Sequence, residues 1–109
     1  MNREYSQPDF YRFNSDSLAL VEWIIQRGHS YSKVLDLGAG CGILGIELAQ
    51  KSYAERITFV EIQKEYEDFL LQNIKNHLAP SQHTEVRWES FKDVHLDEEY
   101  DLIVCNPPY

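Results

Sequence analysis

Three alternating glycines in the segment Asp36-Leu-Gly-Ala-Gly-Cys-Gly42 constrain the fold of this chain more than any other feature. The segment closes a short apolar run, residues 33–37, and precedes a stretch, residues 43–52, whose apolar residues recur at helical spacing. Glycines allow the backbone of such a turn to approach a ligand closely. The N–H groups at the start of the following helix then face an anionic group of that ligand. The segment predicts a strand–turn–helix unit in which Gly38, Gly40 and Gly42 form a ligand-binding turn.

The rest of the chain repeats this alternation of short apolar runs with amphipathic stretches. Apolar residues at helical spacing predict helices, and runs rich in β-branched and aromatic residues predict strands. The predicted helices cover residues 15–27, 43–52 and 64–78, and the predicted strands cover residues 33–37, 56–61, 84–88 and 100–105. Successive strand–helix units predict an α/β fold, a Rossmann-like parallel sheet with flanking helices.

The last predicted strand, residues 100–105, is apolar enough to be buried on both faces. A doubly wound sheet normally continues past its fourth strand, and an apolar strand at a sheet edge is normally covered. We therefore expect a sheet truncated after the fourth strand, in which residues 1–109 form the N-terminal part of a single catalytic domain.

Composition and charge argue against several kinds of protein. No apolar run approaches the roughly 20 residues of a membrane span, and residues 1–10 lack the apolar region of a secretory signal. Cys41 and Cys105 have neither CxxC spacing nor a nearby His, so we expect no metal site and a cytoplasmic protein with free thiols. Because the net charge is −8, we expect any nucleic-acid backbone to be held mostly by surface outside this segment.

Two nucleotide ligands are consistent with the glycine turn. Gly40-Cys-Gly-Ile-Leu-Gly45 matches the dinucleotide pattern G-x-G-x-x-G, and Glu61 follows about twenty residues later, where an acid binds the ribose. Asp36 argues against a dinucleotide, because its carboxylate would repel a pyrophosphate. S-adenosylmethionine has no phosphate and carries an ammonium and a sulfonium, which an aspartate favours. The turn therefore favours S-adenosylmethionine, with Glu61 accepting hydrogen bonds from the ribose hydroxyls.

The end of the third predicted strand should pass near the adenine ring of this cofactor. Glu89, Ser90 and Phe91 follow that strand. A side-chain acceptor there would bind the adenine amino group, and Phe91 would pack against the ring. An ordinary loop is the alternative.

The tetrapeptide Asn106-Pro-Pro-Tyr109 supplies groups for a reaction. An exocyclic amine of a base, or an amide nitrogen, is a poor nucleophile because its lone pair is delocalised. The side-chain carbonyl of Asn106 and the backbone carbonyl of Pro107 can draw such an NH2 group toward tetrahedral geometry. Pro107 and Pro108 stiffen the turn, and Tyr109 can stack on a planar target. These residues predict in-line methyl transfer governed by positioning and electrostatics.

Three segments of the chain resemble the class I S-adenosylmethionine-dependent methyltransferases that modify amino nitrogens. They are Val34-Leu-Asp-Leu-Gly-Ala-Gly-Cys-Gly42, Phe59-Val-Glu-Ile62 and Tyr100-Asp-Leu-Ile-Val-Cys-Asn-Pro-Pro-Tyr109, in the order and spacing of that family. The resemblance implies that the glycine turn with Asp36 holds the methionine part, Glu61 the ribose, and the tetrapeptide the target amine. The family commonly has an aspartate after the third strand, where this chain has Glu89-Ser90.

Residues 10–17, Phe-Tyr-Arg-Phe-Asn-Ser-Asp-Ser, narrow the resemblance. They are similar to a segment of the bacterial tRNA adenine-N6 methyltransferases that act on the anticodon loop of valine tRNA. The resemblance implies a place beside the cofactor for Ser15 and Asp16, although helix capping also explains these two residues.

We therefore expect methyl transfer from S-adenosylmethionine to an exocyclic amino nitrogen, adenine N6 in tRNA, without a metal. One alternative is methylation of a glutamine amide in a protein such as a release factor. Guanine N2 and cytosine N4 are further targets of the same chemistry. A non-catalytic module that only binds cofactor is the alternative from a different class.

Overall fold

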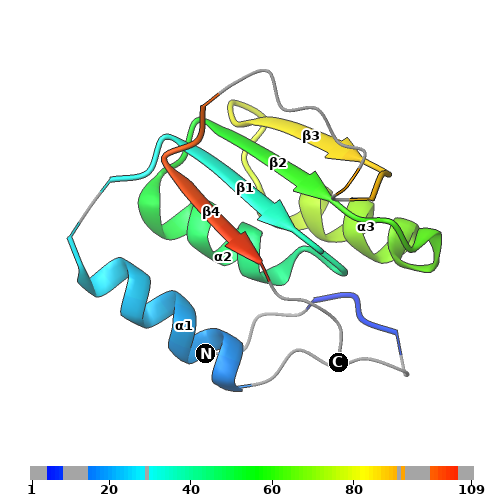
Figure 1. Cartoon of the computed structure of the whole chain (residues 1–109), viewed down its shortest axis with the longest axis horizontal. Helices are drawn as coiled ribbons and strands as arrows, with labels where there is room; N and C mark the ends of the chain where they lie inside the picture. The colour runs from blue at the N-terminus through cyan, green and yellow to red at the C-terminus, as the bar shows by residue number, and fades with distance from the viewer. Residues whose placement is uncertain (1–4, 9–14, 29, 91, 93–98, 106–109) are drawn as a thin grey trace.

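The computed structural model describes residues 5–8, 15–28, 30–90, 92 and 99–105. Helices and strands alternate along the chain up to residue 87, as the sequence predicts, and one more strand follows (Figure 1). In chain order the elements are α1 (Ser15–Gln26), β1 (Lys33–Leu37), α2 (Ile43–Ser52), β2 (Arg56–Val60), the 3-10 turn η1 (Lys64–Tyr66), α3 (Glu67–His77), β3 (His83–Arg87) and β4 (Leu102–Cys105). The predicted α/β fold is confirmed.

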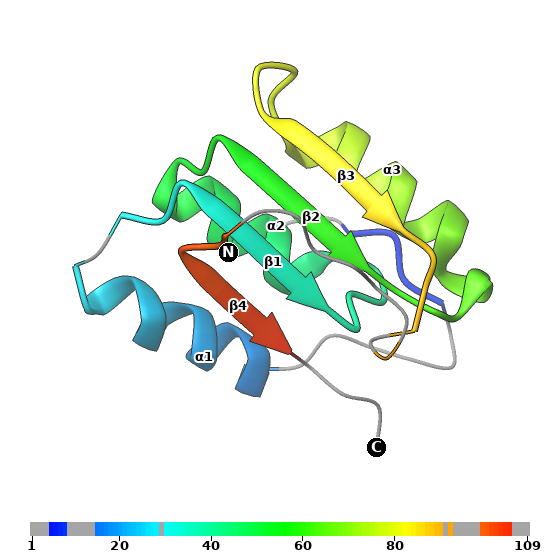
Figure 2. The ribbon, with the colours of Figure 1, turned by 45° about the horizontal axis from the view of Figure 1, so that its top comes forward.

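The described strands form one four-stranded parallel sheet in the order β3-β2-β1-β4. Leu37 lies opposite both Val60 and Cys105, so β1, β2 and β4 end at the same edge. Figure 2 shows the arrows of the strands pointing together toward this edge. In open parallel sheets, ligands bind outside the carboxyl ends of the strands. The glycine turn and the residues after β2 and β4 therefore begin where a ligand is expected.

The described helices pack on one face of the sheet (Figures 1 and 2). Ile57 and Phe59 of β2 pack with side chains of α2 and α3, while Val104 of β4 packs with α1 and α2. Side chains alternate between the two faces of a strand, so Thr58 points to the opposite face. There the Tyr100 hydroxyl donates to Thr58 Oγ1 at 3.2 Å. No helix in the described part of the chain covers that face.

The strand β4 is less buried than the sequence predicts. Val104 faces the helices and is buried, but Ile103 is 56% exposed and Cys105 is exposed as well. The prediction that residues 100–105 are buried on both faces is wrong for this structure. The physical reason is that Ile103 and Cys105 point to the face that no described helix covers, on a strand that pairs with β1 and with no other described strand. Apolar composition indicates a strand, but it does not say which strand lies at the edge.

Local signals explain where the helices begin and end. Gly42, with φ of 83°, precedes α2, and Tyr53, with φ of 56°, ends it in the left-handed conformation. The predicted helix over residues 64–78 begins as the 3-10 turn η1 and continues as α3. Asp68 in the first turn of α3 and Lys75 in the last complement the helix dipole. Within the described ranges, no helix has the length and apolar character needed to cross a membrane.

Candidate functional site

The predicted glycine turn lies between β1 and α2, and its backbone takes a conformation that glycine adopts readily. Gly38, Gly40 and Gly42 have φ of 71°, 57° and 83°, in the left-handed region that side chains disfavour. The N–H groups of Gly38 and Ala39 donate to the carbonyl of Val60 at 2.8 and 3.0 Å, which fastens the turn to the end of β2. A Cβ on Gly42 would lie 2.4 Å from a leucine carbon of α3, so this glycine also allows α3 to pack closely.

Glu61 follows β2 directly and lies buried against this turn. Its Oε1 accepts a hydrogen bond from Gly40 N at 2.7 Å, and its Oε2 accepts from Ile62 N at 3.0 Å and Gln63 N at 2.9 Å. A carboxylate can accept about four hydrogen bonds, so these contacts leave one place, on Oε1. A ligand with two neighbouring hydroxyls would have to displace one backbone donor. The structure brings Glu61 to the turn, and its contact with ribose stays a prediction.

Asp36 lies one residue before the end of β1, below the first turn of α2. Its side chain is 1% exposed. Oδ2 accepts a hydrogen bond from Gly45 N at 3.0 Å, and Oδ1 has no hydrogen-bond partner among the described residues. Burial raises the pKa of Asp36 from 3.8 to about 7; the Gly45 hydrogen bond opposes this shift, and the charge of Glu61 adds to it. A cation placed nearby would restore the charged carboxylate, so the site favours a cationic ligand group.

Gly45, the last glycine of the dinucleotide-like pattern, has a packing role. A Cβ at this position would lie 2.7 Å from Asp36 Oδ2 and 2.8 Å from a ring carbon of Phe59. The absence of a side chain therefore lets α2 approach β1 and β2 closely. The match to G-x-G-x-x-G reflects this close packing and does not by itself indicate a dinucleotide.

Glu89 and Ser90, the predicted adenine contacts, lie beyond the end of β3. Glu89 is exposed, and Ser90 is half-buried, with its Oγ accepting a hydrogen bond from Lys92 N at 3.3 Å. The segment is joined to the site through Glu61 N, which donates to the carbonyl of Arg87 at 3.0 Å. No described contact of Glu89 or Ser90 reaches the glycine turn, so their role toward adenine stays a prediction.

The predicted target-amine residues, Asn106 to Tyr109, lie outside the described residues, as does Phe91. The chain is described up to Cys105, which pairs with Leu37 in the sheet. The tetrapeptide therefore follows in sequence from the edge at which the glycine turn starts. The helix α1 begins at Ser15, as predicted, and the side chains of Ser15 and Asp16 also lie outside the described part.

Two residues near the turn were not predicted from the sequence. Asn73 of α3 is fully buried, and its Nδ2 donates to the carbonyl of Cys41, within the turn, at 2.9 Å. Asn73 is a polar residue on the apolar stripe of the predicted helix 64–78, and this position could have indicated its role. Ile62, next to Glu61, is a large apolar side chain left exposed. Its place beside the acid makes it a candidate surface for a planar ring.

The opposite end of the sheet holds a separate cavity of about 630 Å³, where Ala54 precedes β2 and Gln82 precedes β3. The side-chain amides of Gln50 and Gln82, which line it, donate to backbone carbonyls. No residue of the glycine turn lines this cavity. Among the described residues, no group of three or more His, Cys, Asp and Glu side chains is placed to hold a metal ion.

Comparison with known proteins supports the interpretation of the glycine turn. A family model described as the methyltransferase small domain matches residues 11–109. The tRNA1(Val) (adenine(37)-N6)-methyltransferase of Flavobacterium psychrophilum is 33% identical over 101 residues, which are 90% of this chain and 42% of that relative. The ribosomal RNA large subunit methyltransferase G of Photobacterium profundum is 31% identical over 86 residues, which are 78% of this chain and 23% of that relative. The chain thus spans less than half the length of these relatives.

One solved structure with a similar fold was determined with ligands bound. Coclaurine N-methyltransferase, in complex with N-methylheliamine and S-adenosylhomocysteine, superposes with a TM-score of 0.65 at 25% identity. The superposition covers 93% of this chain and 30% of that protein. The parallel sheet with its glycine turn is therefore similar to the corresponding part of a protein that binds the demethylated cofactor.

Proposed function

Because this chain belongs to the methyltransferase small domain family, we propose that residues 1–109 form the cofactor-binding part of a methyltransferase catalytic domain. The proposed cofactor is S-adenosylmethionine, bound at the carboxyl edge of β1 and β2. One observation carries this proposal. The glycine turn, the buried carboxylate of Asp36 and the carboxylate of Glu61 meet at this edge, with Glu61 Oε1 2.7 Å from Gly40 N.

Each part of the cofactor has a proposed partner in this arrangement. The N–H groups at the start of α2 would hold the carboxylate of the methionine part. Asp36 would favour its ammonium and the sulfonium, because a positive neighbour stabilises the buried carboxylate. Glu61 would accept from the ribose hydroxyls, one of them in place of Gly40 N. Exposed Ile62 would pack on the adenine ring, and Glu89 or Ser90 would accept from its amino group.

The proposed methyl acceptor is an exocyclic amino nitrogen held by the tetrapeptide after β4. The carbonyl oxygens of Asn106 and Pro107 accept hydrogen bonds from the amine, which leaves its lone pair free to attack the methyl carbon. Pro108 stiffens the turn and Tyr109 stacks on the base. The cofactor would supply the methyl group: the N–C bond would form as the S–C bond breaks, with its electron pair staying on sulfur and the proton of the amine passing to water. The pairing of Cys105 with Leu37 supports this role, because the last described residue before the tetrapeptide lies at the sheet edge where the glycine turn starts.

Adenine N6 in tRNA is the proposed target. The Flavobacterium psychrophilum relative bears that activity in its name and matches 90% of this chain. The Photobacterium profundum relative is named for ribosomal RNA, so both favour RNA as the substrate class. Because the net charge is −8, we expect the main phosphate-binding surface to lie outside these residues. The free thiols of Cys41 and Cys105 favour a cytoplasmic location.

The test is a methyl-transfer assay on the full-length gene product with radiolabelled S-adenosylmethionine. Unmodified tRNA, unmodified ribosomal RNA and a release factor are offered separately, and the products are digested to nucleosides or amino acids. Label in N6-methyladenosine from tRNA is expected, and Asn106→Ala should abolish transfer while cofactor binding persists. Label only in ribosomal RNA, or only in glutamine, would refute the proposed target. Cofactor binding without transfer to any of the three would favour the non-catalytic module.

A further inference from the structure

A short N-terminal segment, residues 5–8, is fixed to elements far from it in sequence; we call it the N-terminal clip. Asn73 of α3 makes the central contact. Its Oδ1 accepts a hydrogen bond from Ser6 N at 2.7 Å, and its Nδ2 donates to the carbonyl of Ser6 at 2.9 Å. The second N–H of Nδ2 donates to the carbonyl of Cys41 at 2.9 Å. Because Asn73 is 0% exposed, any of these partners that is lost leaves a polar group buried without a hydrogen bond.

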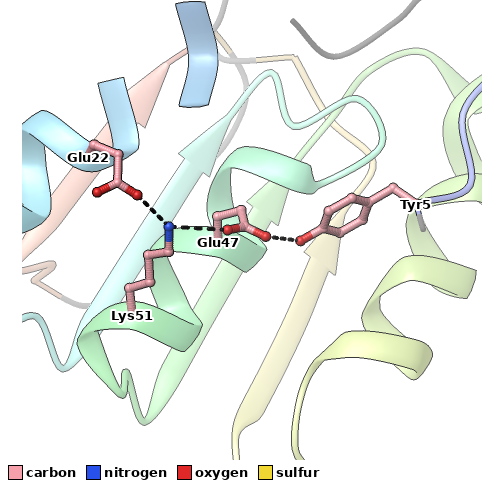
Figure 3. Close-up of polar contacts among 4 residues, drawn as sticks. All are labelled: Tyr5, Glu22, Glu47 and Lys51. Carbon is pink, nitrogen blue, oxygen red and sulfur yellow. Dashed lines mark hydrogen bonds and ion pairs between the residues drawn. The ribbon is translucent and has the colours of Figure 1, made fainter. Parts of the chain in front are cut away.

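Tyr5 gives the clip a second anchor, on α2 (Figure 3). Its hydroxyl donates to Oε2 of Glu47, a carboxylate that is 1% exposed. Lys51 Nζ lies 3.6 Å from Oε1 of Glu47 and 2.7 Å from Glu22 of α1, so the buried charge has a counter-ion. The ring of Tyr5 also packs against the ring of His77, with 4.4 Å between centroids. The clip is thus held by α2 and α3, the two helices that flank the glycine turn.

The clip also supports the turn itself. The Cys41 side chain is buried in a small apolar cluster with Ile43 and Tyr66, and Tyr5 packs against this cluster. Cys41 lies between Gly40 and Gly42, two residues at positive φ. Glycine loses more conformational freedom on ordering than any other residue. The contacts of Asn73 and Tyr5 therefore add to the hydrogen bonds with Val60 and Glu61 that also hold this glycine-rich turn.

We infer that Asn73 is a positioning residue for the cofactor turn, and that docking of the N-terminal clip and binding of the cofactor strengthen each other through it. The inference rests on the proposed function, which makes this turn the binding place of S-adenosylmethionine. Coupling between two binding events is reciprocal. If the docked clip raises the affinity for the cofactor, the cofactor must stabilise the docked clip by the same factor.

The test measures the affinity of the whole chain for S-adenosylhomocysteine by calorimetry. Asn73→Leu, which keeps the size but removes all three hydrogen bonds, and a chain lacking residues 2–8 should each bind about tenfold more weakly. Combining the two changes should add little, because both break the same link. Tyr5→Phe keeps the ring and loses only the bond to Glu47, so its effect should be smaller. Asn76→Ala, at an exposed position of the same helix, is the matched control and should bind as the unchanged chain does.

A second measurement does not depend on how well Asn73→Leu folds. Saturation with S-adenosylhomocysteine should slow hydrogen exchange at the Ser6 amide. The fold-slowing should be about equal to the fold-loss of affinity that removal of the clip causes. The inference would be overturned if the chain bound S-adenosylhomocysteine equally well with and without the clip, or if exchange at the Ser6 amide did not respond to the ligand. Either result would leave the proposed function standing. A full chain that binds no S-adenosylhomocysteine would overturn the proposed function, and this inference with it.

Discussion

Replacing Asp36 with asparagine should stabilise the chain at neutral pH. The carboxylate of Asp36 is buried, one of its oxygens has no hydrogen-bond partner among the described residues, and its pKa is raised to about 7. Asparagine keeps the size and an oxygen that can accept the hydrogen bond from Gly45, but it carries no charge. The difference between a pKa of 3.8 and one of about 7 corresponds to about 4 kcal/mol of unfolding free energy at neutral pH and above.

The pH dependence of this effect has a definite sign. The folded chain keeps the Asp36 proton up to about pH 7, while the unfolded chain loses it near the ordinary value of 3.8. The stability contributed by this group is therefore fully present below the unfolded pKa and is lost as the pH rises through the folded pKa. The unfolding free energy of Asp36→Asn minus that of the unchanged chain should rise by about 1.4 kcal/mol per pH unit between the two values. Above about pH 7 the difference should level off.

Urea unfolding followed by circular dichroism, at intervals from about pH 5 to about pH 8, measures this difference. The cost of fitting the asparagine NH2 group is the same at each pH, so it does not affect how the stability difference changes with pH. That change with pH is what tests the buried carboxylate. Asn76→Ala, at an exposed position of α3, removes no titratable group and is the control; its stability relative to the unchanged chain should not depend on pH. A difference between Asp36→Asn and the unchanged chain that stays flat over this range would refute the idea of a desolvated, uncompensated carboxylate.

Three further predictions concern the same region. Gly42→Ala should lower the unfolding free energy by about 2–4 kcal/mol, because its Cβ would meet α3 at 2.4 Å. Gly28 is also at positive φ but has open space around it, so Gly28→Ala should cost only about 1 kcal/mol. Equal losses in urea unfolding would contradict the close packing at Gly42. Glu61→Gln replaces an acceptor with a donor at one oxygen, so calorimetry should show about tenfold weaker binding of S-adenosylhomocysteine; an unchanged affinity would remove Glu61 from the site. Brief treatment with iodoacetamide followed by peptide mapping should show label on exposed Cys105 before Cys41. The reason is that Cys41 is buried and burial raises its pKa to about 12. Faster labelling of Cys41 would show that the turn opens readily.

Residues 33–61 could be predicted closely from the sequence, because their signals are local. The apolar runs, the spacing of the glycines and an acid at the end of a strand depend on neighbours within one strand–turn–helix unit. The structure bears out the strands and the helix α2, and it adds the positive φ of Gly38, Gly40 and Gly42 as a finding. It also brings Glu61 to the turn, as the predicted parallel pairing requires.

The features that could not be predicted depend on contacts between distant residues. Asn73 bonds to Ser6, sixty-seven residues away, and no periodicity in the sequence encodes that pairing. The role of Gly45 was also hidden, since the same glycine fits a dinucleotide pattern and a close helix–strand contact. The exposure of Ile103 follows from the edge position of β4 and from the absence of a described helix on that face, and both are properties of the whole sheet.

Calorimetric titration of the whole chain with S-adenosylhomocysteine and, separately, with NADH tests the identity of the ligand most directly. The geometry at Asp36 and Glu61 predicts saturable binding of S-adenosylhomocysteine at one site per chain and no binding of NADH. Asp36→Ala should lose that binding while the variant stays folded by circular dichroism. Binding of NADH by a folded chain that ignores S-adenosylhomocysteine would contradict the assignment and return the glycine turn to the dinucleotide class.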